Sequence, residues 1–173
     1  MSTYDYLINA VLVLLVVRQI RGSRLDLMNL VLPLAITAGV AFEYLHSIPT
    51  QGNDLVLILG LAGVGVVLGG AAAATTRLSL GKDGVPFAKA GAVAATLWVL
   101  GIGFRMAFSF ASDHGMGDSI ARFSLQHSIT GSQAWVAALV LMALGEVTTR
   151  LLVLRVRGHL LAGTARRSTL TAA

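Results

Sequence analysis

Long runs of apolar residues alternate with short polar segments along the whole chain. One apolar run of 22 residues, the segment 55–76, LVLILGLAGVGVVLGGAAAATT, carries no charged residue. As an α-helix it would reach roughly 33 Å, and the hydrocarbon core of a bilayer is about 30 Å thick. This segment is therefore predicted to be a membrane-spanning helix. The same pattern predicts five spans in all, at about residues 4–20, 25–45, 55–76, 85–110 and 133–154.

Basic residues are spread unevenly over the segments between these spans. Cytoplasmic segments of membrane proteins carry an excess of Lys and Arg, and Arg122 is the single basic residue assigned to an outer segment. We therefore expect the N-terminus outside and the C-terminus inside, with residues 1–157 forming one transmembrane domain and 158–173 a basic, loosely ordered cytoplasmic tail. The basic residues assigned to the inner side are Arg18, Arg21, Arg24, Arg77, Lys82, Arg155, Arg157, Arg166 and Arg167.

The polar segment 112–133 separates the fourth and fifth predicted spans. Apolar residues between 121 and 129 alternate with polar ones, which is the period of a β-strand. A lone strand has no partner, however, and Asp118 or Ser119 can cap a helix that Gly131 ends. We favour a short helix lying in the outer interface. The fold class expected is thus all-α: a bundle of five transmembrane helices with one short interfacial helix between the fourth and fifth.

Small residues recur every four positions in the third predicted span. Gly65, Gly69 and Ala73 line one face of that helix, where the absence of large side chains lets another backbone approach closely. This face predicts tight helix packing, either within the chain or in a homo-oligomer.

The composition fits a membrane protein and restricts its chemistry. Of the 173 residues 55% are hydrophobic and 12% charged, whereas soluble domains are about a quarter charged. The mean hydropathy is +0.78. The net charge of +5 lies at the ends of the predicted spans, so we expect no nucleic-acid partner. The chain has no cysteine, which excludes thiol-relay chemistry by its own residues. The expected location is the cell membrane.

Two ionisable residues of the predicted spans lie at a similar depth. Glu43 is roughly 27 Å along the second span and Arg105 roughly 30 Å along the fourth, both measured from the inner side. Charges inside a membrane are costly, so the prediction is an ion pair between Glu43 and Arg105. The alternative is an outward-facing anion or headgroup site in which Arg105 is the cation, helped by His46 or His114.

A deeper carboxylate belongs to the fifth span. Glu146 has Arg150 four residues later on the same helical face, so an ion pair within the helix is predicted. The alternative is a proton carrier in a transporter. Pro33 frees the backbone carbonyl of Asn29 in the second span, and this carbonyl is a further candidate for the polar site.

The outer segments contain a candidate binding cluster, formed by His46, Asp113, His114 and His127. Such residues in a polar loop are usually solvated, so no metal or cofactor is predicted. A haem-binding protein remains an alternative, although haem normally takes two imidazoles from facing helices. No known catalytic motif is present, and the sequence does not predict an enzyme.

Several short features resemble the CcdC-like membrane proteins, a family named for its link to cytochrome c biogenesis loci. The matching residues are Arg18 and Arg21, the Leu32-Pro33-Leu34 run, the aliphatic run from Leu97 to Phe104 that leads to Arg105, and the stretch from Trp135 to Arg150. The resemblance covers roughly residues 11–155 and implies a helical integral membrane protein without an agreed activity.

Together these observations favour a small polytopic membrane protein that acts as a binding or accessory component of an assembly. Its expected partners are the lipid bilayer and either a second copy or another membrane protein. A transporter or channel protomer is the first alternative, and a membrane haem or redox partner is the second.

Overall fold

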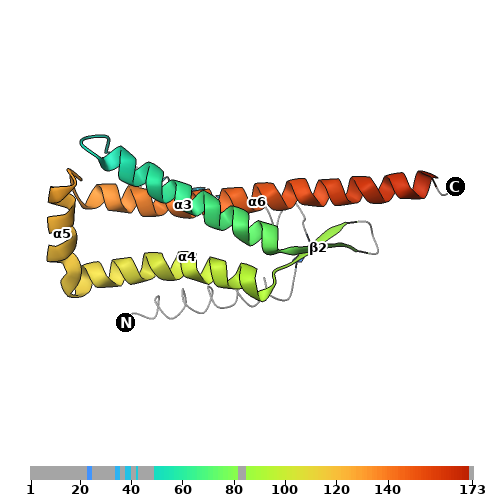
Figure 1. Cartoon of the computed structure of the whole chain (residues 1–173), viewed down its shortest axis with the longest axis horizontal. Helices are drawn as coiled ribbons and strands as arrows, with labels where there is room; N and C mark the ends of the chain where they lie inside the picture. Colours follow the sequence, from blue (N-terminus) through green and yellow to red (C-terminus); the bar gives the residue numbers. More distant parts are fainter. Residues whose placement is uncertain are drawn as a thin grey trace.

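The helices that the structure describes lie roughly along one axis, and one short helix is turned across their end (Figure 1). The structure is a computed structural model that describes residues 23–24, 34–35, 38–39, 42, 49–81 and 85–171. It is mostly helical. The predicted span 4–20 and most of the predicted span 25–45 lie outside the described residues.

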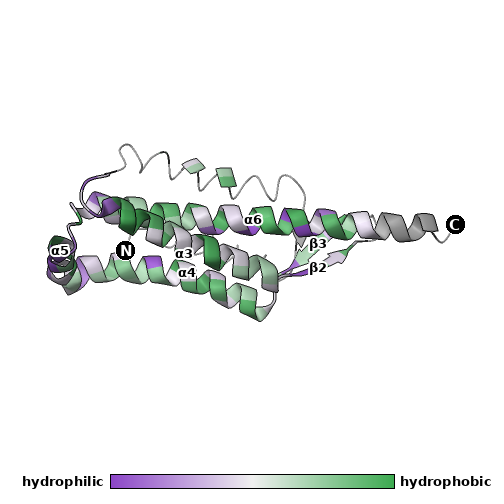
Figure 2. Ribbon diagram, turned by 45° about the horizontal axis from the view of Figure 1, so that its top comes forward, coloured by the Kyte–Doolittle hydropathy of each residue, from purple (hydrophilic) through white to green (hydrophobic). Residues whose placement is uncertain are grey.

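Three described helices are long and apolar enough to cross a membrane. One spans Asp54–Thr75, and a second runs from Ala92 through a kink to Gln126. The third covers Ser132–Thr164 and continues as helix to Thr171. Figure 2 shows that apolar residues dominate these helices along most of their length. The elements are α3 (Asp54–Thr75), α4 (Ala92–Ala111), a π-turn (Ser112–Met116), α5 (Gly117–Gln126) and α6 (Ser132–Thr171).

The tightest packing in the described part is between α3 and α6. A Cβ atom added to Gly65 would lie 2.0 Å from the Met142 carbonyl oxygen, and one added to Gly69 would lie 2.2 Å from the Glu146 carbonyl oxygen. Ala73 is fully buried on the same face. The two backbones therefore touch because these α3 positions have little or no side chain. The predicted small-residue face lies against α6 of the same chain.

The outward faces of the helices are apolar rather than polar. Val67 of α3 is 69% exposed, and Leu100 and Phe110 of α4 are 58% and 64% exposed. Water would disfavour so much exposed apolar surface, whereas lipid chains would not. The exposed surface is therefore compatible with a membrane environment.

A small antiparallel sheet joins α3 to α4, and the all-α prediction is wrong there. β2 (Arg77–Leu80) pairs with β3 (Pro86–Lys89), which also pairs with β1 (Ser23–Arg24). Polar and apolar residues alternate along β2, which favours a strand. Pro86 is the first residue of β3, a position where its missing N–H is tolerated. Consequently α4 begins at Ala92, whereas residue 85 was predicted.

Two further boundaries concern the predicted outer helix and the tail. The segment 112–133 forms the predicted short helix, and α5 crosses the end of the bundle (Figure 1). α5 begins at Gly117, one residue before Asp118, which had been expected to cap the helix. At the other end α6 continues well past residue 154, because Ala, Leu and Arg of the tail are good helix formers. The predicted loosely ordered tail is therefore helical as far as Thr171.

Candidate functional site

The one ion pair among the described residues joins α4 to α6. Arg105 donates from Nη1 to Glu146 Oε2 at 2.9 Å, and the side chains are 20% and 2% exposed, respectively. Side chains of a helix point toward its N-terminus, so Arg105 reaches back by one turn to the level of Gly101. Glu146 thus pairs with Arg105 and not with Arg150, its predicted partner. Glu43, the predicted partner of Arg105, lies outside the described residues, so that pair stays a prediction.

Gly101 makes room for the Glu146 carboxylate. A Cβ atom at residue 101 would lie 2.6 Å from Oε2 and 2.9 Å from Oε1. The carboxylate therefore occupies the space that a side chain of α4 would otherwise fill. Glu146 Oε1 is buried and accepts no hydrogen bond from the part of the chain that the structure describes.

Arg150 lies one turn along α6 from Glu146 but turns toward α4. Its guanidinium carbon is 6.0 Å from the centre of the Trp98 ring, within the range of a cation–π contact. Arg105, Glu146 and Arg150 form what we call the charge cluster. With Trp98 and Gly101 it fills the space between α4 and α6. Two guanidinium groups in this cluster face one carboxylate, so its net charge is +1.

The depth of the charge cluster can be read along the two helices. Arg105 lies 13 residues, or roughly 20 Å, from Ala92 at the hairpin end of the bundle, and Glu146 lies 14 residues, or roughly 21 Å, from Ser132 at the opposite end. A charged side chain near the centre of a membrane costs about 2.5–3.5 kcal/mol on insertion scales. Pairing Arg105 with Glu146 offsets part of that cost. Arg150 makes no ion pair with a residue that the structure describes.

The predicted outer binding cluster is not assembled by the residues that the structure describes. His114 precedes α5 and His127 follows it, so the whole helix separates them. The His114 Nδ1 hydrogen-bonds the Phe110 carbonyl at 3.0 Å, and the His127 Nδ1 bonds the Phe123 carbonyl at 2.9 Å. Asp113 is exposed, and no group of three metal-ligating side chains occurs in the described ranges. The remaining predicted site residues, Asn29, Glu43 and His46, lie outside the described residues.

A second buried acid holds the start of α3 to the connection between α5 and α6. Asp54 is fully buried, accepts the Thr130 backbone N–H at 2.8 Å, and accepts the Thr130 hydroxyl. Asn53 adds two bonds of 2.9 Å, from its N–H to the Ser128 carbonyl and from its side-chain amide to the His127 carbonyl. An acid in the first turn also interacts favourably with the helix dipole. This contact closes the end of the bundle that carries α5.

The opposite end of α3 is held by Arg157 of α6. Its Nη1 donates to the carbonyl oxygens of Ala73, Ala74 and Thr76, the last two at 3.1 and 3.2 Å. These carbonyls belong to the last turn of α3 and its C-cap, where carbonyl groups run out of helical N–H partners. The Ala73 carbonyl also accepts the Thr76 N–H at 3.2 Å. A cation at this position is also favoured by the helix dipole. Both ends of α3 are therefore held in place. The connection between α5 and α6 holds its first turn, and Arg157 of α6 holds its last turn.

Trp135 connects three helices. Its ring stacks on Phe108 of α4 with centroids 4.8 Å apart, and its Nε1 donates to Ser124 Oγ of α5 at 3.0 Å. Phe123 of α5 lies 6.2 Å away on another side. Trp135 thus fixes the junction of α4, α5 and α6 about three turns above Glu146.

Comparison with known proteins identifies no similar protein. No protein-family model, no curated protein and no solved structure matches the chain.

Sequence reasoning missed three of these contacts. Asp54 and Arg157 were counted only as charges of polar segments, although an acid at a helix start and a base near a helix end are visible signals. Gly101 lies four residues before Arg105 on the same helical face, and this spacing was the available sign that a polar group approaches there. No local sequence pattern identifies Glu146 as that polar group.

Proposed function

We propose that this chain is a multi-pass protein of the cell membrane, with five spans, the N-terminus outside and the C-terminus inside. It acts as a binding or accessory component of a membrane assembly. The CcdC-like resemblance supports the same class and stays a prediction. The observation that carries the proposal is the charge cluster, in which Arg105 pairs with Glu146 and the Arg150 guanidinium lies over Trp98, between apolar helices.

The excess charge indicates what a partner must bring. Arg105 uses only Nη1 toward Glu146, and Arg150 makes no hydrogen bond to the described residues. A group with an anionic or carbonyl oxygen would bind their remaining N–H donors. A donor such as an amide or hydroxyl would satisfy Glu146 Oε1. A polar group on a helix of a second copy or of another membrane protein meets these requirements.

The surface next to the cluster is suited to a helix. Phe104 immediately precedes Arg105 on α4 and is 48% exposed, and Leu100 is 58% exposed. Helices in membranes associate through packing and through hydrogen bonds between polar side chains. The partner helix is therefore placed along α4.

Photo-crosslinking in native membranes tests this proposal. A photoreactive phenylalanine replaces Phe104 beside the cluster, and the same residue replaces Val67 on the exposed face of α3 as the control position. We expect a protein adduct from position 104 that is several times stronger than the one from position 67. Mass spectrometry of the adduct separates a second copy from another protein.

Two matched variants connect the adduct to the charge cluster. Arg150→Gln should abolish the adduct, whereas Arg122→Gln, which changes an exposed arginine of α5, should leave it unchanged. Glu43→Gln is made in parallel, because Glu43 was the predicted partner of Arg105. An adduct of equal strength in wild type and Arg150→Gln would refute the proposal.

A second candidate function is the transport of a small anion. It is favoured by the same net positive charge together with the 20% exposure of Arg105. Liposomes loaded with chloride measure it directly. If the protein transports chloride, liposomes that contain it should release chloride faster than liposomes without protein, and Arg150→Gln should abolish the difference. Equal release from protein-containing and empty vesicles would leave binding and assembly as the function.

A further inference from the structure

The β2–β3 hairpin carries two cations opposite each other. The register pairs Arg77 with Lys89, and both side chains are exposed. Directly opposed residues in an antiparallel pair have Cβ atoms about 4.5–5.5 Å apart, and like charges at this distance destabilise the pair. Neither cation has a carboxylate within ion-pair distance among the residues described here. The hairpin therefore keeps an unfavourable charge pair that a bound anion would neutralise.

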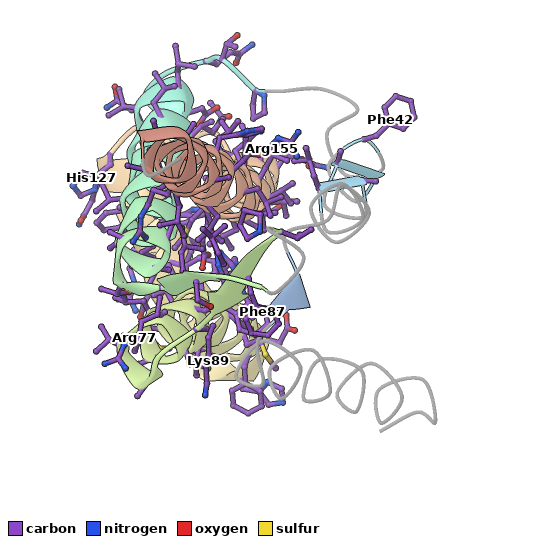
Figure 3. All side chains as sticks on the ribbon, turned by 90° about the vertical axis from the view of Figure 1, so that its right-hand side faces the viewer. Phe42, Arg77, Phe87, Lys89, His127 and Arg155 are labelled. Carbon is purple, nitrogen blue, oxygen red and sulfur yellow. The ribbon has the colours of Figure 1, made fainter. Side chains whose placement is uncertain are left out.

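The position of the hairpin against α6 prevents these cations from turning inward. β2 and β3 both contact α6, and Ala88 of β3 is buried. Leu78, the partner of Ala88, shares its face of the sheet, because opposed residues point to the same side. Arg77 and Lys89 belong to the other face. Figure 3 shows both of them on the side of the hairpin turned away from α6.

The cation pair lies where two candidate spans end. Arg77 is two residues beyond Thr75, the last residue of α3, and Lys89 is three residues before Ala92, the first of α4. With these helices in a membrane, the pair lies at the level of the lipid headgroups. Phe87 is on the same face of the sheet, and aromatic side chains are favoured at this level.

We propose that Arg77 and Lys89 together bind the phosphate group of an anionic phospholipid on the inner side of the membrane. Two cations from neighbouring strands can contact separate oxygens of one phosphate, and Phe87 packs beside its glycerol region. The inference rests on membrane insertion of α3 and α4. It requires neither the charge cluster nor a protein partner.

Native mass spectrometry of the full chain in detergent measures this binding, with phosphatidylglycerol and phosphatidylcholine as probes. Each basic residue near a charged membrane surface contributes about 1 kcal/mol, which corresponds to roughly fivefold in affinity. Phosphatidylglycerol affinity should therefore fall roughly fivefold in Lys89→Gln and roughly 30-fold in the double variant Arg77→Gln/Lys89→Gln. Arg122→Gln, at the opposite end of the bundle, should retain the affinity of wild type.

The Lys89→Glu variant tests the unfavourable pairing of Arg77 with Lys89 separately from lipid binding. This variant converts the opposed cations into an opposite-charge pair, so it should unfold at a temperature roughly 1–4 °C higher than Lys89→Gln in the absence of lipid. It should also lose the preference for phosphatidylglycerol. The proposal is overturned if the double variant keeps the wild-type preference. It is also overturned if inorganic phosphate at the same concentration displaces the lipid, because the site would then take free phosphate.

Discussion

The contact between Gly69 and α6 predicts a large difference between two neighbouring glycines. A Cβ atom on Gly69 would lie 2.2 Å from the Glu146 carbonyl oxygen, whereas one on Gly70 would meet only the Thr149 methyl group, at 3.8 Å. Alanine is a better helix former than glycine by roughly 1 kcal/mol, and this gain is common to both positions. The comparison of Gly69→Ala with Gly70→Ala therefore isolates the clash.

The size of the effect follows from the distance. Ordinary contact begins at 3.4 Å, so α3 and α6 must separate by about 1.2 Å at Gly69 to admit the methyl group. Overpacking of this kind typically costs about 1–3 kcal/mol. For a chain of this size the corresponding difference in unfolding temperature between the two variants is roughly 2–12 °C.

Thermal unfolding of the purified full chain in detergent measures this difference. The fraction that stays folded is monitored by size-exclusion chromatography of heated samples. Gly65→Ala should behave like Gly69→Ala, since its Cβ would lie 2.0 Å from the Met142 carbonyl oxygen. Gly63→Ala should behave like Gly70→Ala, because nothing lies within 4 Å of its Cβ. If Gly69→Ala and Gly70→Ala unfold at the same temperature, the close approach of α3 and α6 is wrong.

Two further predictions concern the ends of α3. Asp54→Ala removes the acceptor of both Thr130 bonds and should lower stability by about 1–3 kcal/mol, with faster hydrogen exchange at residues 128–131 as the local measurement. Arg157→Ala removes the side-chain donor to the carbonyls of Ala74 and Thr76, and exchange should quicken at residues 73–76 while residues 54–58 stay protected. Exchange that is unchanged at these segments would contradict the respective contact.

The helices were predictable wherever a charge marks the edge of an apolar run. Residues 55–76 were predicted for α3, and Asp54–Thr75 is observed, because Asp54 and Arg77 bracket the run. The predicted start of α4 was wrong because the apolar residues of β3 continue directly into the helix. Apolar content alone does not separate a strand from the helix that follows it. The end of α6 was missed because a polar helix has no hydropathy signal.

The members of the charge cluster were predictable, but their pairing was not. Arg105 and Glu146 are conspicuous because each interrupts an apolar run. Which of them meet depends on how α4 and α6 are rotated and shifted against each other, and periodicity along either helix carries no such information. The contact between Asp54 and Thr130 was hidden for the same reason, since 76 residues separate the two.

The partner of α3 is synthesised late. Residues 76–131 lie between Thr75, the end of α3, and Ser132, where α6 begins. At about 5–20 residues per second, a ribosome needs roughly 3–11 s to make this stretch. During that interval the glycine face of α3 lacks the α6 backbone that it contacts in the finished structure, and its first turn lacks Thr130. Both α3 and α4 are complete before α6 is made, so the tightest contact among the described helices can form only at the end of synthesis.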